Sequence, residues 1–355
     1  MKKTLNYFLA ANSCEGFISH FNDCYNPHDN WKAYIIKGGP GTGKSSFMKK
    51  IAAFAENIKE SYILCPCSSD PNSLDAVIIP QRKIVILDGT APHTLDPSYP
   101  AVCEEILNFG QFWDTKKIKN TKEIIEITNL NKALHKTANK YLASAGQIML
   151  DTYHTVLNCT KKVETKAFAE KLCKKHIPKS NGTGYEWVRF LEGITPNGII
   201  SFPDTITGSC KNIIVISDKY HTCSNIIINE VRNYCLLNGY EIITLKNPFL
   251  PTIITNHVII PKLSLAFVTE DIHTTFNCDS RRIHSRRFTS TKLLHNSISR
   301  LKLNRKVTNS LICAATNTLS QAKEVHDQLE SYYINAMDFE KLNKFAENFS
   351  ANLST

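Results

Sequence analysis

The sequence lacks long hydrophobic runs, although 42% of its 355 residues are hydrophobic. No apolar stretch approaches the roughly 20 residues that a membrane-spanning helix needs, so we expect no membrane-bound protein. The start of the chain, Met1–Lys3 and a short apolar stretch, imitates an export signal only faintly, because Asn6 interrupts the stretch and no convincing cleavage site follows. The sequence therefore predicts a cytoplasmic protein, and its length suggests about two domains.

Closely paired cysteines are scarce. Twelve cysteines are scattered along the chain, and only Cys65 and Cys67 stand close together, with no second pair at the spacing of zinc ligands. We therefore expect reduced, partly buried thiols rather than a metal site at this pair.

Acidic residues are missing between Asp279 and Glu324, and this stretch contributes much of the net charge of +10. Such a stretch suits nucleic acid, an anionic substrate or the phosphates of another domain, and it equally suits a solvated helix face. One of the first four arginines of this stretch, Arg281, Arg282, Arg286 or Arg287, is also a candidate arginine finger for the phosphate site of the first unit. The basic residues are Arg281, Arg282, Arg286, Arg287, Lys292, Arg300, Lys302, Arg305 and Lys306.

The chain does contain a complete phosphate-loop pattern, because residues 38–45 match G-x-x-x-x-G-K-[ST] at every position. Its glycines let backbone N–H groups turn toward an anion, Lys44 can reach the β- and γ-phosphates, and Ser45 can ligate Mg²⁺. The flanks fit, since residues 31–37 predict a strand and a helical pattern starts at Ser45. The predicted nucleotide-binding residues are Gly38, Gly39, Pro40, Gly41, Thr42, Gly43, Lys44, Ser45 and Ser46.

The chain also repeats itself at an offset of about 180 residues. We therefore predict an α/β fold of two tandem P-loop NTPase-like units, each a mostly parallel sheet flanked by helices and followed by a helical segment. Four segments recur in one order: 16–19 as 198–201, 34–36 as 213–215, 77–80 as 258–261, and 84–93 as 263–273. The predicted boundaries are 1–112 for the first unit, 113–180 for a helical arm and linker, 181–288 for the second unit, and 289–355 for a C-terminal helical segment.

The second copy differs where chemistry is expected. Aligned on the repeat, residues 38–46 correspond to 217–225, all four glycines are gone, and Cys223 stands at the place of Lys44. Side chains then stand where backbone N–H groups approach phosphate, and the cation is absent. We expect a degenerate unit that lacks the phosphate loop and serves as a structural or regulatory partner.

Two residues after the third predicted strand are candidates for the same site. Asp88 ends the apolar run 84–88 and is the candidate to hold Mg²⁺ through water, or it caps the strand-to-loop turn. His93 is a candidate to sense the γ-phosphate or act on substrate, but a histidine in the equivalent loop, His273, favours a structural role.

Asp70 lies in the loop after the strand predicted over 61–64. Ligands of open α/β sheets lie at the C-terminal ends of strands, so Asp70 is a candidate to position the nucleophile. The alternative is an Asx turn before Pro71 with a helix that starts at Ser73. The sequence leaves both interpretations open.

These motifs together resemble a known group. The chain is similar to the duplicated P-loop ATP-binding proteins of bacteria, known only as ATPases or ATP-binding proteins. The resemblance implies two P-loop units, often both with a phosphate loop, and this chain departs from it at residues 217–224. The matching stretches are 7–8, 12–21, 37–49, 67–75, 77–80, 87–93, 96–100, 332–334 and 336–339.

The leading hypothesis is a Mg²⁺-dependent nucleotide hydrolase, chiefly for ATP, in the first unit. Lys44 and the loop N–H groups would stabilise the transferring γ-phosphoryl, Ser45 and Asp88 would place the metal, and Asp70 would position the nucleophile. A kinase for a small molecule or nucleotide would use the same parts. A nucleotide-gated binding module with little turnover, for nucleic acid at residues 281–306, is the third alternative.

Overall fold

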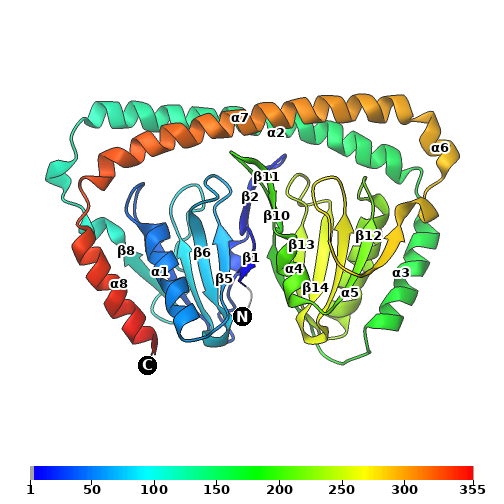
Figure 1. The fold of residues 1–355 in the computed structure, drawn as a ribbon, viewed down its shortest axis with the longest axis horizontal. Coiled ribbons are helices and arrows are strands. Elements are labelled where there is room, and N and C mark those ends of the chain that lie inside the picture. The colour runs from blue at the N-terminus through cyan, green and yellow to red at the C-terminus, as the bar shows by residue number, and fades with distance from the viewer. Residues whose placement is uncertain (1–3, 355) are drawn as a thin grey trace.

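The computed structural model describes residues 4–354, which form an α/β structure with two six-stranded sheets beneath two long helices (Figure 1). Met1–Lys3, the basic start considered above as part of an export signal, lie outside the described residues. Within residues 4–354, no helix has both the length and the apolar character required for a membrane span.

The two sheets have the same strand order. The first runs β1-β5-β6-β7-β4-β8, and the second, read from its inner edge, runs β9-β13-β14-β15-β12-β16. The first comprises β1 (Leu5–Asn6), β4 (Lys32–Lys37), β5 (Ile63–Pro66), β6 (Leu74–Ile79), β7 (Ile84–Asp88) and β8 (Glu104–Asn108). The second comprises β9 (Tyr185–Arg189), β12 (Asn212–Ser217), β13 (Glu241–Lys246), β14 (Thr255–Ile260), β15 (Leu265–Glu270) and β16 (Arg281–His284).

Both sheets are mixed, because β6 and β14 run antiparallel to their neighbours while the other pairings are parallel. The helix considered from Ser73 is wrong: Leu74 begins strand β6, whose residues are all buried. A continuous buried run of six residues is typical of a strand that is covered on both faces.

A shared core joins the two halves. The hairpins β2 (Ala10–Ser13)/β3 (Gly16–Ser19) and β10 (Glu192–Thr195)/β11 (Gly198–Ser201) lie between the sheets (Figure 1). Phe8 and Phe190 form a backbone bridge there, and the rings of Trp31 and Trp187 lie 5.6 Å apart. One buried hydrophobic cluster therefore contains residues from both halves.

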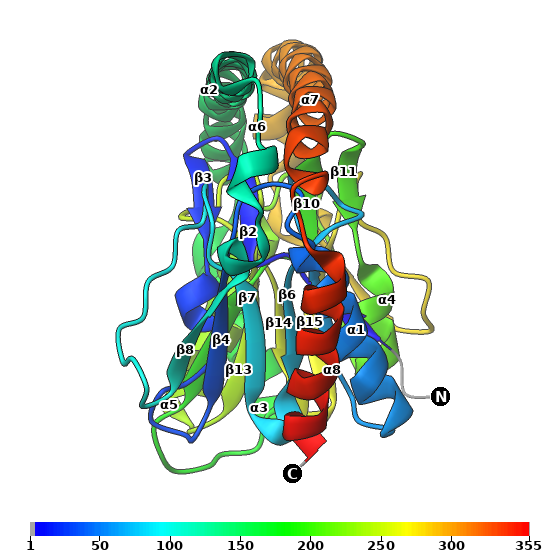
Figure 2. The same cartoon turned by 90° about the vertical axis from the view of Figure 1, so that its left-hand side faces the viewer.

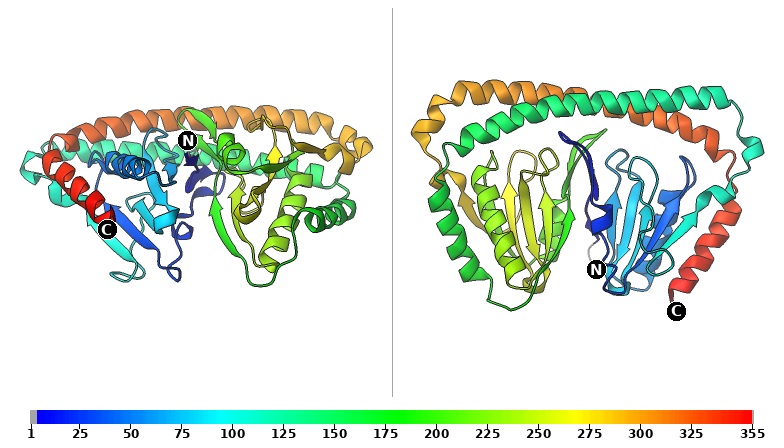
Figure 3. Two further views of the ribbon diagram at one scale, coloured as in Figure 1. Left: turned by 60° about the horizontal axis from the view of Figure 1, so that its bottom comes forward. Right: turned by 180° about the vertical axis from the view of Figure 1, so that it is seen from behind.

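Two long helices connect the two halves of the molecule. Helix α2 (Thr121–Leu157) leaves the first sheet and crosses to the second, where α3 (Lys162–His176) packs on α5 (Thr222–Leu237). Helix α7 (Ile298–Ile334) returns along α2 from the short helix α6 (Thr291–Asn296). Helix α8 (Phe339–Ser354) then packs on α1 (Lys44–Asn57), as Figure 2 shows. The rear view of Figure 3 shows α8 at the outer side of the first unit. Each unit thus has an outer helix, α3 on α5 or α8 on α1, that a long helix connects to the other unit.

Candidate functional site

The glycine loop, residues 38–43, connects β4 to α1 as predicted. Gly41 and Gly43 adopt φ of +69° and +78°, a left-handed conformation that favours glycine. A Cβ atom on Gly39 would lie 2.8 Å from the Trp113 ring, and one on Gly43 would lie 2.9 Å from Leu342 of α8. The loop therefore needs its glycines both for its turns and for the close approach of its neighbours.

Lys44 and Asp88 lie together at the same edge of the first sheet. Strands β4 and β7 are parallel neighbours, with Ile36 opposite Asp88. Lys44 therefore comes after the C-terminal end of one strand, and Asp88 is the last residue of the strand beside it. The Lys44 Nζ lies 3.6 Å from Asp88 Oδ2 and donates to the carbonyls of Gly38 and Gly39 at 3.0 and 2.9 Å. The Asp88 Oδ1 accepts from the Thr90 N–H at 2.9 Å. Asp88 thus caps its turn with one oxygen while the other faces Lys44.

The hydroxyl side chains of the loop fall into different settings. Thr42 is buried and donates to the Gly39 carbonyl at 2.8 Å. The Ser45 Oγ accepts from the Leu74 N–H at 3.0 Å, which ties the start of α1 to the start of β6. Ser46 is exposed. Of these residues, Ser45 presents an oxygen next to Lys44 at the head of the helix.

Asp70 forms the Asx turn that was one of its two interpretations. Its carboxylate accepts from the Asn72 N–H at 3.2 Å and from the Ser73 hydroxyl at 2.9 Å. Lys323, on the distant helix α7, lies 3.5 Å from the same carboxylate. The loop after β5 is therefore held against α7.

Helix α7 also touches the glycine loop. The Glu330 Oε1 accepts from the Gly41 N–H at 3.2 Å, and His326 lies 3.5 Å from the same oxygen. The hydrogen bond from His326 is the main cause that holds the pKa of Glu330 below its ordinary range against the effect of burial, and the charge of His326 and the Gly41 N–H add to it. The Glu330 carboxylate therefore accepts a hydrogen bond from a backbone N–H group of the loop, the kind of donor that binds anions. No local sequence signal points to Glu330, which is 289 residues from Gly41.

The equivalent loop of the second unit is shorter. Four residues, 218–221, join β12 to α5, against six residues, 38–43, in the first unit. His221 takes the left-handed position of Gly43, with φ of +57°. The expected alignment of Cys223 with Lys44 is therefore wrong, because the shorter loop brings Thr222 to that place.

The carboxylate of Asp218 lies at the N-terminus of α5. Asp218 is 2% exposed, and its Oδ2 accepts from the Ser224 N–H at 2.9 Å while its Oδ1 accepts from the Tyr220 N–H at 3.2 Å. Beside it, His221 Nε2 lies 2.9 Å from Asp271 Oδ2. Burial favours the neutral forms of both partners, but their mutual hydrogen bond and charge prevail, so the pKa of His221 is raised and that of Asp271 is lowered.

His93 is buried beneath the loops of the first unit. It stacks on Phe21 with ring centres 4.7 Å apart, and its Nε2 lies 3.3 Å from Asp75 Oδ1. Counted from the matching starts of β7 and β15, its counterpart is the buried Thr274 and not the exposed His273. The comparison with His273 therefore gives no support to the structural role.

The arginines considered for an arginine finger lie elsewhere. Arg281 and Arg282 belong to β16, the edge of the second sheet opposite the edge strand β9 that lies toward the first unit. Arg282 pairs with Glu270 at 3.4 Å, and the Arg287 guanidinium lies over the Phe168 ring, 4.8 Å from its centre.

Comparison with protein-family models, with curated proteins and with solved structures found no match for this chain.

Proposed function

We propose that residues 1–112 form a P-loop NTPase-like unit that binds a nucleoside triphosphate, chiefly ATP, with Mg²⁺ and hydrolyses it. The observation that carries the proposal is the glycine loop before α1 with Lys44 Nζ 3.6 Å from Asp88 Oδ2 at the end of the neighbouring parallel strand. A helix N-terminus, a curled glycine backbone and a lysine form an anion site, and the adjacent carboxylate suits a metal beside it.

Each residue of the site would have its own role in binding the phosphates and the metal. Lys44 would exchange the carbonyls of Gly38 and Gly39 for phosphate oxygens, and the loop N–H groups would stabilise negative charge on the γ-phosphoryl. Ser45 and Asp88 supply hydroxyl and carboxylate oxygens, the donors that Mg²⁺ prefers, so the residues fit this ion. The ion would neutralise phosphate charge when bound.

The second unit is proposed to bind no triphosphate in this way. The Asp218 carboxylate already accepts from the Ser224 N–H at the head of α5, where a phosphate would have to bind. Thr222 supplies no cation at the place of Lys44. This unit would instead support the first one through the shared core and through α7.

A Lys44→Ala variant tests the proposal. The variant should bind ATP on the order of 10- to 100-fold more weakly, because it loses charged hydrogen bonds to phosphate, and should release no phosphate above background. Lys32→Ala, which removes an exposed lysine on β4, is the matched control. Unchanged binding and phosphate release in Lys44→Ala, with the fold checked by circular dichroism, would contradict the proposal.

A nucleotide-gated binding module is a second candidate, favoured by the contact between Glu330 and the Gly41 N–H. A triphosphate that takes this N–H would displace the carboxylate and loosen α7 at its C-terminal end. Hydrogen exchange of residues 323–334 should then speed up when ATP is added, even where turnover is negligible. Exchange that ATP leaves unchanged would remove this candidate.

A further inference from the structure

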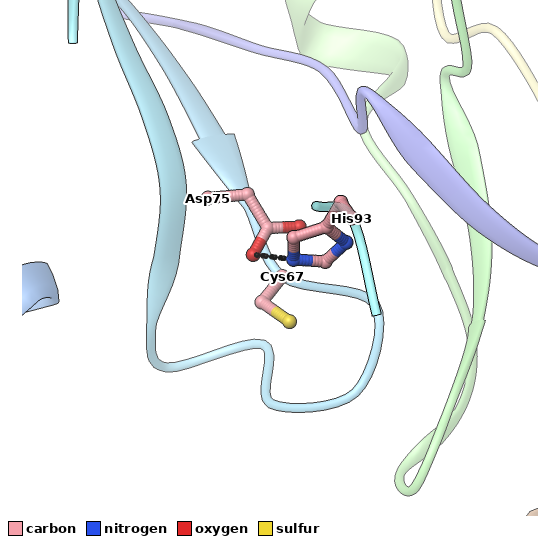
Figure 4. Close-up of side chains that lie close together, drawn as sticks. All are labelled: Cys67, Asp75 and His93. Carbon is pink, nitrogen blue, oxygen red and sulfur yellow. Dashed lines mark ion pairs between the residues drawn. The ribbon is translucent and has the colours of Figure 1, made fainter. Parts of the chain in front are cut away.

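Three residues with metal-binding side chains meet at one edge of the first sheet. Strands β5, β6 and β7 are neighbours, and β6 runs in the opposite direction, so the start of β6 lies with the ends of β5 and β7. Cys67 follows β5, Asp75 is the second residue of β6, and His93 lies in the loop after β7. Figure 4 shows the three side chains converging.

The geometry of this cluster is close to that of a metal site. One ligand atom from each of Cys67, Asp75 and His93 lies within 4.8 Å of the other two. His93 directs Nε2 toward Asp75 Oδ1 at 3.3 Å. The Cys67 Sγ accepts from the Ser69 N–H at 3.4 Å, a bond that orients the sulfur. The cluster thus offers one sulfur, one nitrogen and one carboxylate at mutual distances that a single ion can span.

Burial makes the cluster costly without a further partner. Asp75 is 2% exposed and His93 is 7% exposed. Among residues 4–354, Asp75 Oδ2 and His93 Nδ1 have no hydrogen-bond partner. A buried carboxylate oxygen without a partner loses the hydration it had in water. A cation beside it would offset that loss.

A cysteine nucleophile activated by histidine does not fit this arrangement. Such a pair needs the histidine within hydrogen-bond reach of the sulfur, with the carboxylate behind the histidine. Here His93 Nε2 is directed at Asp75, and no hydrogen bond joins Cys67 to His93 in the described part of the chain.

We propose that Cys67, Asp75 and His93 bind a Zn²⁺ ion. Thiolate, imidazole and carboxylate together suit Zn²⁺, whereas Mg²⁺ requires oxygen donors. Three protein ligands leave a fourth position for water or substrate. Cys67 is only partly buried, which gives an ion a way in.

This site goes beyond the proposed nucleotide function and uses none of its residues. It is nevertheless tied to the glycine loop, because Leu74, the neighbour of Asp75, donates its N–H to Ser45 Oγ. A bound ion would also join Cys67 and Asp75 at the two ends of the loop that carries Asp70. Zinc would therefore order the loop that faces α7.

The test is a titration of the full chain, stripped of metal by a chelator, with Co²⁺ in the absence of nucleotide. We expect one equivalent to give a thiolate-to-Co²⁺ charge-transfer band that Zn²⁺ then abolishes. Cys67→Ser should remove the band, and His93→Gln and Asp75→Asn should weaken Co²⁺ binding at least about tenfold. Cys313→Ser and His295→Gln, which change exposed residues, are the matched controls and should keep the band.

Two outcomes would overturn the proposal. One is Co²⁺ binding without a thiolate band in the unchanged protein. The other is a band of equal strength and affinity in Cys67→Ser, whose near-isosteric side chain leaves the fold intact by circular dichroism. Lys44→Ala should retain the band, so a failure of the nucleotide function and a failure of the zinc site are distinguishable.

Discussion

The two units differ at the head of one helix within the same strand order. In the first, six residues with glycine at the left-handed turn lead into Lys44, and in the second, four residues with His221 at that turn lead into Thr222. The second unit also places the buried Asp218 carboxylate on the N–H of Ser224. The comparison shows that the N-terminus of α5 is capped by a buried carboxylate of its own unit, whereas the N-terminus of α1 follows a loop with glycine at the left-handed position.

The contrast extends to what covers each loop. The glycine loop of the first unit is approached by Glu330 of α7, which belongs to the far half of the chain. The second loop is held by Asp271 of its own unit through His221. The first loop is thus contacted by a carboxylate distant in sequence, and the second by a carboxylate of its own unit.

The largest expected effect comes from breaking that local pair with Asp271→Asn. The change leaves His221 without its carboxylate in a buried place and should cost about 3 kcal/mol of unfolding free energy at about pH 6. Its raised pKa means that His221 contributes below its ordinary value of 6.5 and loses the contribution as pH rises through the folded value. The lowered pKa of Asp271 means that the carboxylate contributes above its ordinary value of 3.8 and loses the contribution as pH falls.

Urea unfolding of both proteins at several pH values checks this prediction. The destabilisation should be greatest between about pH 4 and 6.5 and should shrink as the pH rises through the raised folded-state pKa of His221. A cost that stays the same from pH 6 to pH 9 would show that the pair is no ion pair.

A smaller effect is expected from Asp218→Ala. The variant loses the carboxylate that caps α5 at Ser224, which should cost about 1 kcal/mol of unfolding free energy. It should gain no ATP site, because Thr222 still supplies no cation. A second ATP site that appears in this variant on isothermal calorimetry would show that Asp218 alone blocks the second unit.

The smallest effect is expected from Glu330→Gln. The loop N–H of Gly41 then faces a neutral and weaker acceptor, so nucleotide should displace it more readily. ATP affinity should rise about two- to tenfold by calorimetry. Glu324→Gln, an exposed residue on the same helix, is the control. An affinity that falls or is unchanged would mean that Glu330 does not compete with phosphate.

Local pattern was enough to predict part of this structure. The strand before the glycine loop, the helix after it and the α/β class are confirmed by β4, α1 and the two sheets. The proximity of Lys44 and Asp88 follows from two adjacent parallel strands whose apolar runs are visible in the sequence. The chemistry of these residues stays a prediction.

The remainder depends on contacts that no local pattern encodes. Glu330 reaches Gly41 only because α7 crosses back over the first unit. The cluster of Asp75 with Cys67 and His93 depends on the reversed direction of β6. The sequence left open a helix start at the first residues of β6, so this strand and its direction were not predicted. The misplacement of Cys223 arose from a loop shortened by two residues, which an alignment without gaps cannot detect.

The most direct test of the central claim is the number of ATP sites per chain. Calorimetric titration with a non-hydrolysable ATP analogue and Mg²⁺ should give one site in the unchanged protein, and Lys44→Ala should weaken binding at that site on the order of 10- to 100-fold. Two sites in the unchanged protein, or one site of undiminished affinity in a folded Lys44→Ala protein, would contradict the account that the first unit alone binds the nucleotide.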